Sequence, residues 1–190
     1  MIFQILLSTT LIAIVQGAGC DVKWPNGTDT ALHWWQCDSS PVKFYNATTS
    51  FVNGTSMYPL YLDGLMLIKA DMYDPSYTFK SPNLRGNGSI WSWGGHSGCV
   101  WSTVPTFGMT DNLDACEYGV PCPVYPGRQW LTIRFDLTKF QKITQFLTND
   151  APYQIQLLMY DDSYHIKLPT HIAHVSKWKQ HWKGLSSQQL

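Results

Sequence analysis

The chain has 190 residues, of which 44% are hydrophobic, so we expect one main domain with a sizeable buried core. Basic and acidic residues number 13 each, and the formal net charge is therefore zero. This balance argues against a nucleic-acid partner, which needs a basic surface. Charged residues make up only 14% of the sequence, so Ser, Thr, Asn and attached sugar must supply much of the polar surface.

The first residues predict entry into the secretory pathway. Residues 2–15 form an apolar run of signal-peptide length, which is short for a membrane span, and small residues at Gly17 and Gly19 suit cleavage. We therefore expect residues 1–19 to be a signal peptide, with a retained anchor as the alternative. Residues 20–36 show no clear period and are expected to be an N-terminal extension. Four acceptor sequences predict N-glycosylation, at Asn26, Asn46, Asn53 and Asn87.

Strand patterns begin after this extension. Residues 42–52 are rich in aromatic and β-branched side chains and predict a first strand. Asn46 shares a face with Val42 and Phe44, so either a β-bulge shifts the pattern or Asn46 carries no sugar. Residues 65–73 alternate between apolar and polar positions up to Asp74-Pro75, which predicts a second strand. Shorter strands are expected at 89–93 and 100–104.

The most ordered pattern of the sequence lies at residues 114–137. Cys116 and Cys122 flank a turn at Gly119, a second turn follows at Pro126-Gly127, and a strict alternation then runs from Leu131 to Leu137. This alternation predicts a half-buried strand.

The last third of the chain predicts a helix or strand followed by two strands. Residues 139–148 are ambiguous, although Phe140, Ile143 and Leu147 have helical spacing. Residues 153–159 predict a strand, and Asp161-Asp162-Ser163 predicts a hairpin turn. A final strand is expected over 164–172, with an edge or bulge at Pro169.

The Cys-x5-Cys-Pro segment, its Pro-Gly turn and the strand that follows resemble the ML (MD-2-related lipid-recognition) domains, which include the ganglioside activator and the Niemann-Pick type C cholesterol carrier. The resemblance covers residues 37–175 and is also specific at 164–172. About seven short strands by themselves predict an all-β sandwich. The resemblance further implies an immunoglobulin-like pair of antiparallel sheets with an internal lipid cavity, in a secreted or lysosomal protein. It also implies a loop or an edge strand, instead of a helix, at residues 139–148.

Five cysteines leave one without a disulfide partner in an oxidising compartment. The resemblance implies a disulfide between Cys116 and Cys122. The family's bridge from the first to the last strand is missing, because His165 occupies the second position. Cys37 is then expected to pair with either Cys99 or Cys20.

The strand patterns place a set of apolar residues between the two sheets. By pattern alone these residues favour a solid core, and only the resemblance turns them into a lipid-binding set: Met66, Ile68, Met72, Leu131, Ile133, Phe135, Ile155, Leu157, Met159, Ile166 and Leu168. The resemblance implies a non-enzymatic protein that extracts, carries or presents single lipids, such as a sterol, glycolipid or phospholipid. A lipid hydrolase or a transporter would be its protein partner.

Other chemistries have weaker signals. The segment Gly95-His96-Ser97-Gly98 does not meet the spacing of a nucleophile elbow. His171, His174 and the pair Asp161-Asp162 are better explained by a strand and a turn, so no catalytic residue, metal site or cofactor is expected. The alternative function is a sugar-binding module that uses the rings of Trp91, Trp93 and Trp101.

The tail, residues 176–190, lies beyond the resemblance. Trp178, Trp182 and Leu185 have helical spacing, and Ser176 is placed to cap such a helix. A short helix with tryptophan and lysine suits transient contact with a membrane surface. The alternative is a frayed tail or one packed on the sandwich.

Overall fold

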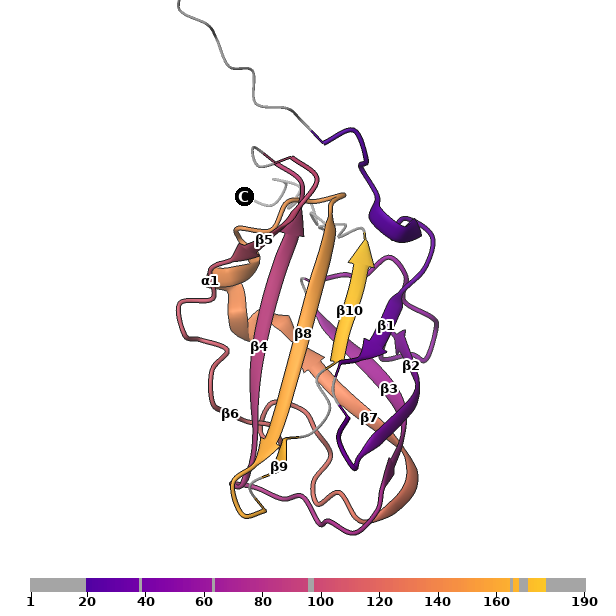
Figure 1. Ribbon diagram of the computed structural model, residues 1–190, viewed down its shortest axis with the longest axis vertical. Helices are drawn as coiled ribbons and strands as arrows, with labels where there is room; N and C mark the ends of the chain where they lie inside the picture. Colours follow the sequence, from indigo (N-terminus) through magenta and orange to yellow (C-terminus); the bar gives the residue numbers. More distant parts are fainter. Residues whose placement is uncertain are drawn as a thin grey trace, which may run out of the picture.

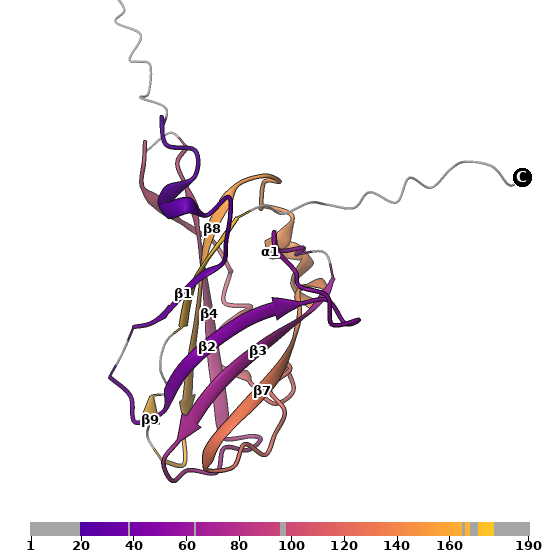
Figure 2. The same ribbon diagram turned by 90° about the vertical axis from the view of Figure 1, so that its right-hand side faces the viewer.

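The alternating segments of the sequence become the strands of two antiparallel sheets that pack face to face (Figures 1 and 2). The computed structural model describes residues 20–37, 39–62, 64–95, 98–164, 166–167 and 171–176, the last two ranges by their backbone alone. An all-β sandwich is thus confirmed. Strands of the two sheets cross at an angle in Figure 1, as the twist of packed sheets requires.

The larger sheet has its longest strands in the middle. Its order is β1 (His33–Gln36), β10 (His171–Ser176), β8 (Pro152–Asp161), β4 (Leu84–Trp93) and β5 (Trp101–Val104). Two short strands are added at the sides, where β6 (Leu113–Asp114) pairs with β4 and β9 (Ile166–Lys167) pairs with β8.

The smaller sheet consists of β2 (Lys43–Ser50), β3 (Leu65–Asp74) and β7 (Gly127–Asp136), with β3 in the middle. The predicted inner faces of β3 and β7 meet in register, because Met66 pairs with Phe135 and Ile68 with Ile133. Paired residues on antiparallel strands point to the same side, so these four side chains form an apolar area on one face of the sheet.

A β-bulge resolves the conflict in the first strand. The pairing of β2 with β3 shifts register between Phe44 and Asn46, so Tyr45 and Asn46 are both exposed while Phe44 turns inward. The sequence left open whether a bulge intervenes or Asn46 carries no sugar, and the bulge is present. An exposed Asn46 is sterically open to glycosylation.

The helical spacing of residues 139–148 also has a structural basis. A short 3-10 helix η2 (Leu137–Phe140) continues into α1 (Gln141–Thr144), whose Ile143 and Thr144 are buried. A further 3-10 turn, η1 (Pro25–Gly27), precedes β1. Among the described residues, no helix is long and apolar enough to cross a membrane.

Three expected elements differ from the structure. β4 begins five residues before the expected strand, at Leu84, because Gly86 and Gly88 hide its alternation. β1, within the expected N-terminal extension, is an edge strand paired with β10. Within and after the strand expected over 164–172, the structure describes β9 and β10, and β10 continues beyond the expected end to Ser176. The rest of the tail, residues 177–190, and the signal-peptide segment, residues 1–19, lie outside the described residues.

One predicted disulfide is confirmed, and the second pairing was not anticipated. Cys116 is bonded to Cys122, and Cys20 is bonded to Cys99, so both expected pairings of Cys37 were wrong. The physical reason is that the chain near Cys20 lies against the end of β4, where Trp93 Nε1 donates a hydrogen bond to the Val22 carbonyl at 2.7 Å. Two disulfides fit an extracellular or lumenal protein.

The core between the sheets is divided into two clusters of buried side chains. The first surrounds α1 and contains Met66, Ile90, Ile143 and Tyr153 among others. The second lies against the Cys116–Cys122 loop and contains Met72, Phe79, Val120 and Leu131 among others. A domain of this size usually has one contiguous core, so the division is a feature that needs an explanation.

Candidate functional site

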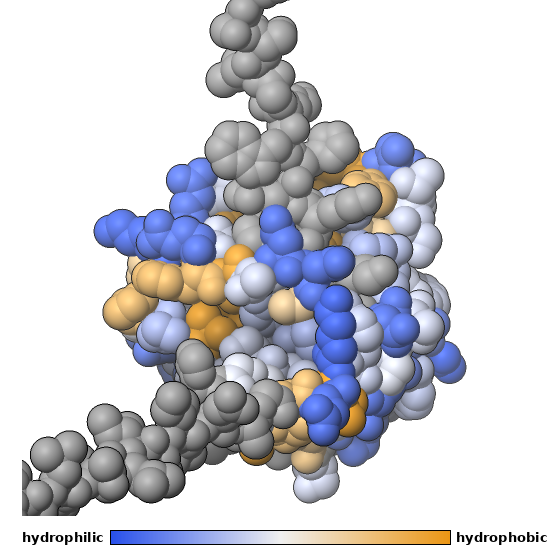
Figure 3. Space-filling view, turned by 90° about the horizontal axis from the view of Figure 1, so that it is seen from above, coloured by the Kyte–Doolittle hydropathy of each residue, from blue (hydrophilic) through white to orange (hydrophobic). Residues whose placement is uncertain are grey.

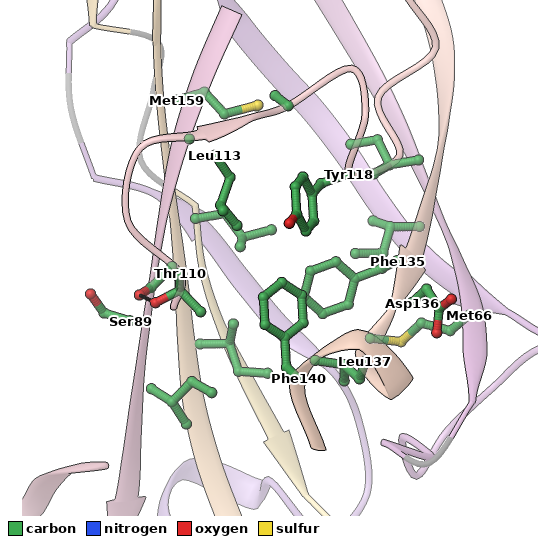
Figure 4. Close-up of a pocket in the computed structure, with 18 of the residues that line it drawn as sticks. Met66, Ser89, Thr110, Leu113, Tyr118, Phe135, Asp136, Leu137, Phe140 and Met159 are labelled. Carbon is green, nitrogen blue, oxygen red and sulfur yellow. Dashed lines mark hydrogen bonds between the residues drawn. The ribbon is translucent and has the colours of Figure 1, made fainter. Parts of the chain in front are cut away.

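A cavity separates the two core clusters and is lined by both sheets (Figure 4). Its volume is about 200 Å³, more than ten times the roughly 10–15 Å³ that one ordered water requires. The lining is largely apolar, and an ordered water needs two to four polar partners. Such a space suits an apolar ligand better than water.

Seven of the eleven residues predicted to lie between the sheets line this cavity. They come from β3, β7 and β8, and are Met66, Ile68, Ile133, Phe135, Ile155, Leu157 and Met159. Their period-two spacing on three strands placed them on the inner faces, and only the resemblance predicted that they line a cavity.

The other four do not belong to the described lining. Met72 is 1% exposed and Leu131 is 6% exposed, and both pack in the second cluster away from the cavity. Leu168 and the side chain of Ile166 lie outside the described residues. The sequence pattern identifies the inner face of each strand, but it does not show at which inner positions neighbouring side chains fill the space.

Two glycines of β4 belong to the lining. Gly86 and Gly88 both line the cavity, and they occupy alternate positions between the buried Leu84 and Ile90. Side chains at alternate positions share one face of a strand. A Cβ atom at Gly86 would lie 3.7 Å from the Leu158 carbonyl oxygen and 3.9 Å from Met159 Cγ, whereas one at Gly88 would lie 3.3 Å from Thr110 Cβ, so the Thr110 side chain occupies the place beside Gly88. The sequence analysis missed this part of the lining because glycines interrupt the hydrophobic pattern.

Aromatic rings from three segments close the cavity toward the small sheet. Tyr118 comes from the Cys116–Cys122 loop, Phe135 from β7 and Phe140 from η2, and Figure 4 shows all three pointing into the same space. The rings of Tyr118 and Phe140 are 5.7 Å apart between centroids. The spacing of Phe140 with Ile143 and Leu147, which also line the cavity, was visible in the sequence as a helical pattern.

The exposed end of the lining is at η2. Of the residues that line the cavity, Lys139 alone is exposed, which indicates that the cavity reaches the surface beside it. The ammonium group of Lys139 lies 5.1 Å from the centroid of the Tyr118 ring. The neighbouring Asp136 carboxylate accepts hydrogen bonds from the backbone N–H and the hydroxyl of Thr138, at 3.0 and 2.6 Å.

Buried polar groups fix the two segments that cover the cavity. Burial raises the pKa of the Tyr153 hydroxyl, which stays protonated and donates a hydrogen bond to the Thr148 carbonyl at 3.0 Å, just beyond α1. At the start of the disulfide loop, burial alone would raise the pKa of Asp114. Hydrogen bonds from Ser81 and from two backbone N–H groups outweigh it and hold that pKa below its usual value.

The residues considered for sugar binding are all half-buried. Trp93 packs on Trp101 with ring centroids 5.1 Å apart, and both rings are half-buried. Trp91 is also half-buried, and none of the three lines the cavity. Their arrangement therefore differs from an open stacking platform.

Of the residues considered for catalysis, Asp161 forms a turn, and two others lie outside the described residues. Asp161 accepts hydrogen bonds from the backbone N–H groups of Ser163 and Tyr164, which is the predicted hairpin turn. His96 and Ser97 lie outside the described residues. Within the described part of the chain, no cluster of three or more His, Cys, Asp or Glu side chains is placed to hold a metal ion.

The predicted glycosylation sites differ in exposure. Asn26, Asn46 and Asn53 are exposed, whereas Asn87 is half-buried. Asn87 lines the cavity and its side-chain oxygen accepts a hydrogen bond from the Asn112 backbone N–H at 2.6 Å. Asn87 is thus the least accessible of the four acceptors.

The chain matches no model of a known protein family, and no curated protein matches it. The interpretation of the cavity therefore depends on its own geometry and on the sequence resemblance described above.

Proposed function

We propose that this protein is a non-enzymatic lipid-binding protein that extracts, carries or presents single lipids, with the hydrocarbon part of the lipid held between the two sheets. The observation that carries the proposal is the apolar cavity between two separate core clusters. A sandwich selected for stability alone would close such a space, because a cavity forfeits packing contacts on every side.

The energetics of such a site need few polar groups. Each buried CH₂ group contributes roughly 0.8 kcal/mol, so an acyl chain of about 16 carbons gains on the order of 12 kcal/mol before the costs of binding. Affinity then depends on apolar area, and the polar residues near Lys139 remain to distinguish one head group from another.

The resemblance to ML domains supports the same function. It rests on the Cys116–Cys122 loop and the alternating strand after it, and both of these elements contribute to the lining through Tyr118, Ile133 and Phe135. Membership of that family is part of the proposal, as are secretion or lysosomal delivery and a hydrolase or transporter as partner.

The direct test is native mass spectrometry of the secreted protein, together with organic extraction and uptake of a fluorescent fatty acid. We expect a bound lipid, or uptake of the fatty acid at one molecule per chain. A purified protein that carries no lipid and takes up none would refute the proposal.

A pair of matched variants tests whether the space beside Leu157 is a ligand cavity or part of a solid core. Leu157 lines the cavity and Leu131 does not, although both lie on inner faces of strands. We expect Leu131→Trp to lower the free energy of unfolding by about 1–3 kcal/mol by overpacking. Leu157→Trp should change stability less and should reduce fatty-acid uptake. If Leu157→Trp instead destabilises the protein as much as Leu131→Trp and leaves uptake unchanged, the space is not the ligand site.

A further inference from the structure

An aromatic pair projects from the surface beside α1. Phe107 is 67% exposed and Phe146 is 54% exposed, and their ring centroids are 5.8 Å apart although they come from different loops. Single exposed apolar residues are ordinary, but two large rings in contact form a patch. In the view from above (Figure 3), hydrophobic residues gather on the left, the side on which Figure 1 places α1, with hydrophilic residues beside them.

The backbone at Phe107 indicates that this exposed ring has a role. The Met109 backbone N–H donates to the Thr106 carbonyl at 3.0 Å, and both central residues of the turn, Phe107 and Gly108, have positive φ, at 53° and 73°. Turns of this kind favour Asn or Gly at both positions, and a bulky residue with positive φ is an outlier. An aromatic ring kept in an unfavourable backbone conformation, and directed to solvent, points to a function outside the fold.

One short segment, α1 and the turn after it up to Leu147, contributes to both the patch and the cavity lining. Ile143 and Leu147 line the cavity from the inner side of this segment. Lys142 and Phe146, four residues apart, are exposed, so they lie together on its outer side. Lys142 thus adds an exposed cationic residue four positions before Phe146.

We propose that Phe107, Phe146 and Lys142 form a docking surface for a lipid bilayer, with the two rings entering the interface and the lysine meeting lipid phosphates. Aromatic rings next to a lysine suit the boundary between head groups and acyl chains, where an apolar body and a charged end are both accommodated. The position next to the cavity brings the membrane to the proposed lipid site. The purpose of this docking surface rests on the proposed function, whereas its test measures vesicle binding and does not depend on that function.

The test compares three variants of the full chain for co-flotation with two kinds of vesicle, phosphatidylcholine alone and phosphatidylcholine with phosphatidylserine. The first is the double variant Phe107→Asn with Phe146→Gln, in which Asn also suits the positive φ. The second is Lys142→Gln. The control is Trp130→Gln, which removes a ring that is 59% exposed on β7 of the small sheet.

We expect the double variant to bind both kinds of vesicle on the order of tenfold more weakly, because the buried apolar area is lost. Lys142→Gln should weaken binding to the phosphatidylserine vesicles by about fivefold and leave binding to phosphatidylcholine unchanged. Trp130→Gln should bind like the wild type. Thermal unfolding checks that every variant is folded.

Equal vesicle binding by the double variant and the wild type would overturn the docking surface. So would a loss of vesicle binding with Trp130→Gln as large as that of the double variant, or a wild type that binds no vesicles. A dimer in sedimentation equilibrium that the double variant dissociates would assign the patch to self-association instead. Uptake of a monomeric fluorescent fatty acid is measured in parallel and should be the same in all variants. A wild type that binds vesicles but carries no extractable lipid and takes up no fatty acid would refute the lipid-carrier function and leave the docking surface standing.

Discussion

Replacement of Gly119 by alanine tests how the disulfide loop is held against β7. Gly119 has a φ of +119°, and a Cβ atom at this position would lie 2.0 Å from the carbonyl oxygen of Arg134 and 2.8 Å from its carbonyl carbon. The contact is with backbone, which cannot rotate away as a side chain does. The Gly119 carbonyl also accepts a hydrogen bond from the Arg134 N–H at 2.9 Å, so the loop and the strand must separate to admit a methyl group.

The expected cost follows from these contacts. A non-glycine residue with positive φ costs about 1–2 kcal/mol, the lost hydrogen bond about 1 kcal/mol, and partial exposure of the neighbouring Val120 a further share. We therefore expect Gly119→Ala to lower the free energy of unfolding by about 3–5 kcal/mol. Because Tyr118 and Val120 line the cavity, fatty-acid uptake should fall as well.

Gly54→Ala is the matched control. Gly54 has a φ of +86°, but no heavy atom lies within 4 Å of its Cβ position, so the variant should show only the backbone cost of about 1–2 kcal/mol. Both variants are measured by urea unfolding with the disulfides intact, followed by tryptophan fluorescence. Equal destabilisation by the two substitutions would show that the loop does not pack on β7 as described.

Two further predictions concern the disulfides and the ion pair on the small sheet. Removal of the Cys20–Cys99 bridge, which spans 79 residues, should lower stability by up to about 4.5 kcal/mol, against about 2.2 kcal/mol for the Cys116–Cys122 bridge, which spans 6. Urea midpoints of the paired Cys→Ala variants check this order, and a larger loss from the short bridge would contradict the loop-entropy argument. The Arg128 guanidinium, which donates hydrogen bonds of 3.1 and 2.7 Å, lowers the pKa of Asp71 below its ordinary 3.8. The stability from this pair is therefore complete above pH 3.8 and is lost as the pH falls through the folded-state pKa, so Asp71→Asn should flatten the acid limb of the stability profile. An unchanged acid limb would argue against that contribution.

The two proposals are linked by the segment from η2 to Phe146. Its inner side closes the cavity, its one exposed lining residue is Lys139, and its outer side carries Lys142 and Phe146. A movement of this segment at a membrane surface would change access to the cavity. The separate readouts of vesicle binding and fatty-acid uptake examine the two sides of the segment independently.

The alternation of apolar and polar residues determined much of the fold by itself. It placed β3, β7 and β8 and identified seven residues of the lining, because a strand with one buried face needs a period of two. The hairpin turn at Asp161 was likewise readable from local hydrogen-bonding chemistry. The Cys116–Cys122 bridge followed from the short loop and the resemblance it carries.

The tertiary structure decided what depends on distant segments. The pairing of Cys20 with Cys99 requires the N-terminal chain to lie at the end of β4, and no local pattern encodes that approach. Met72 and Leu131 share the periodicity of the lining residues, yet neighbouring side chains fill the space around them. The cavity itself arises between the sheets, where residues of β4 and the rings of Tyr118, Phe135 and Phe140 line one space. A sequence specifies which side chains turn inward, but whether they meet or leave a space is set by packing between segments far apart in the chain.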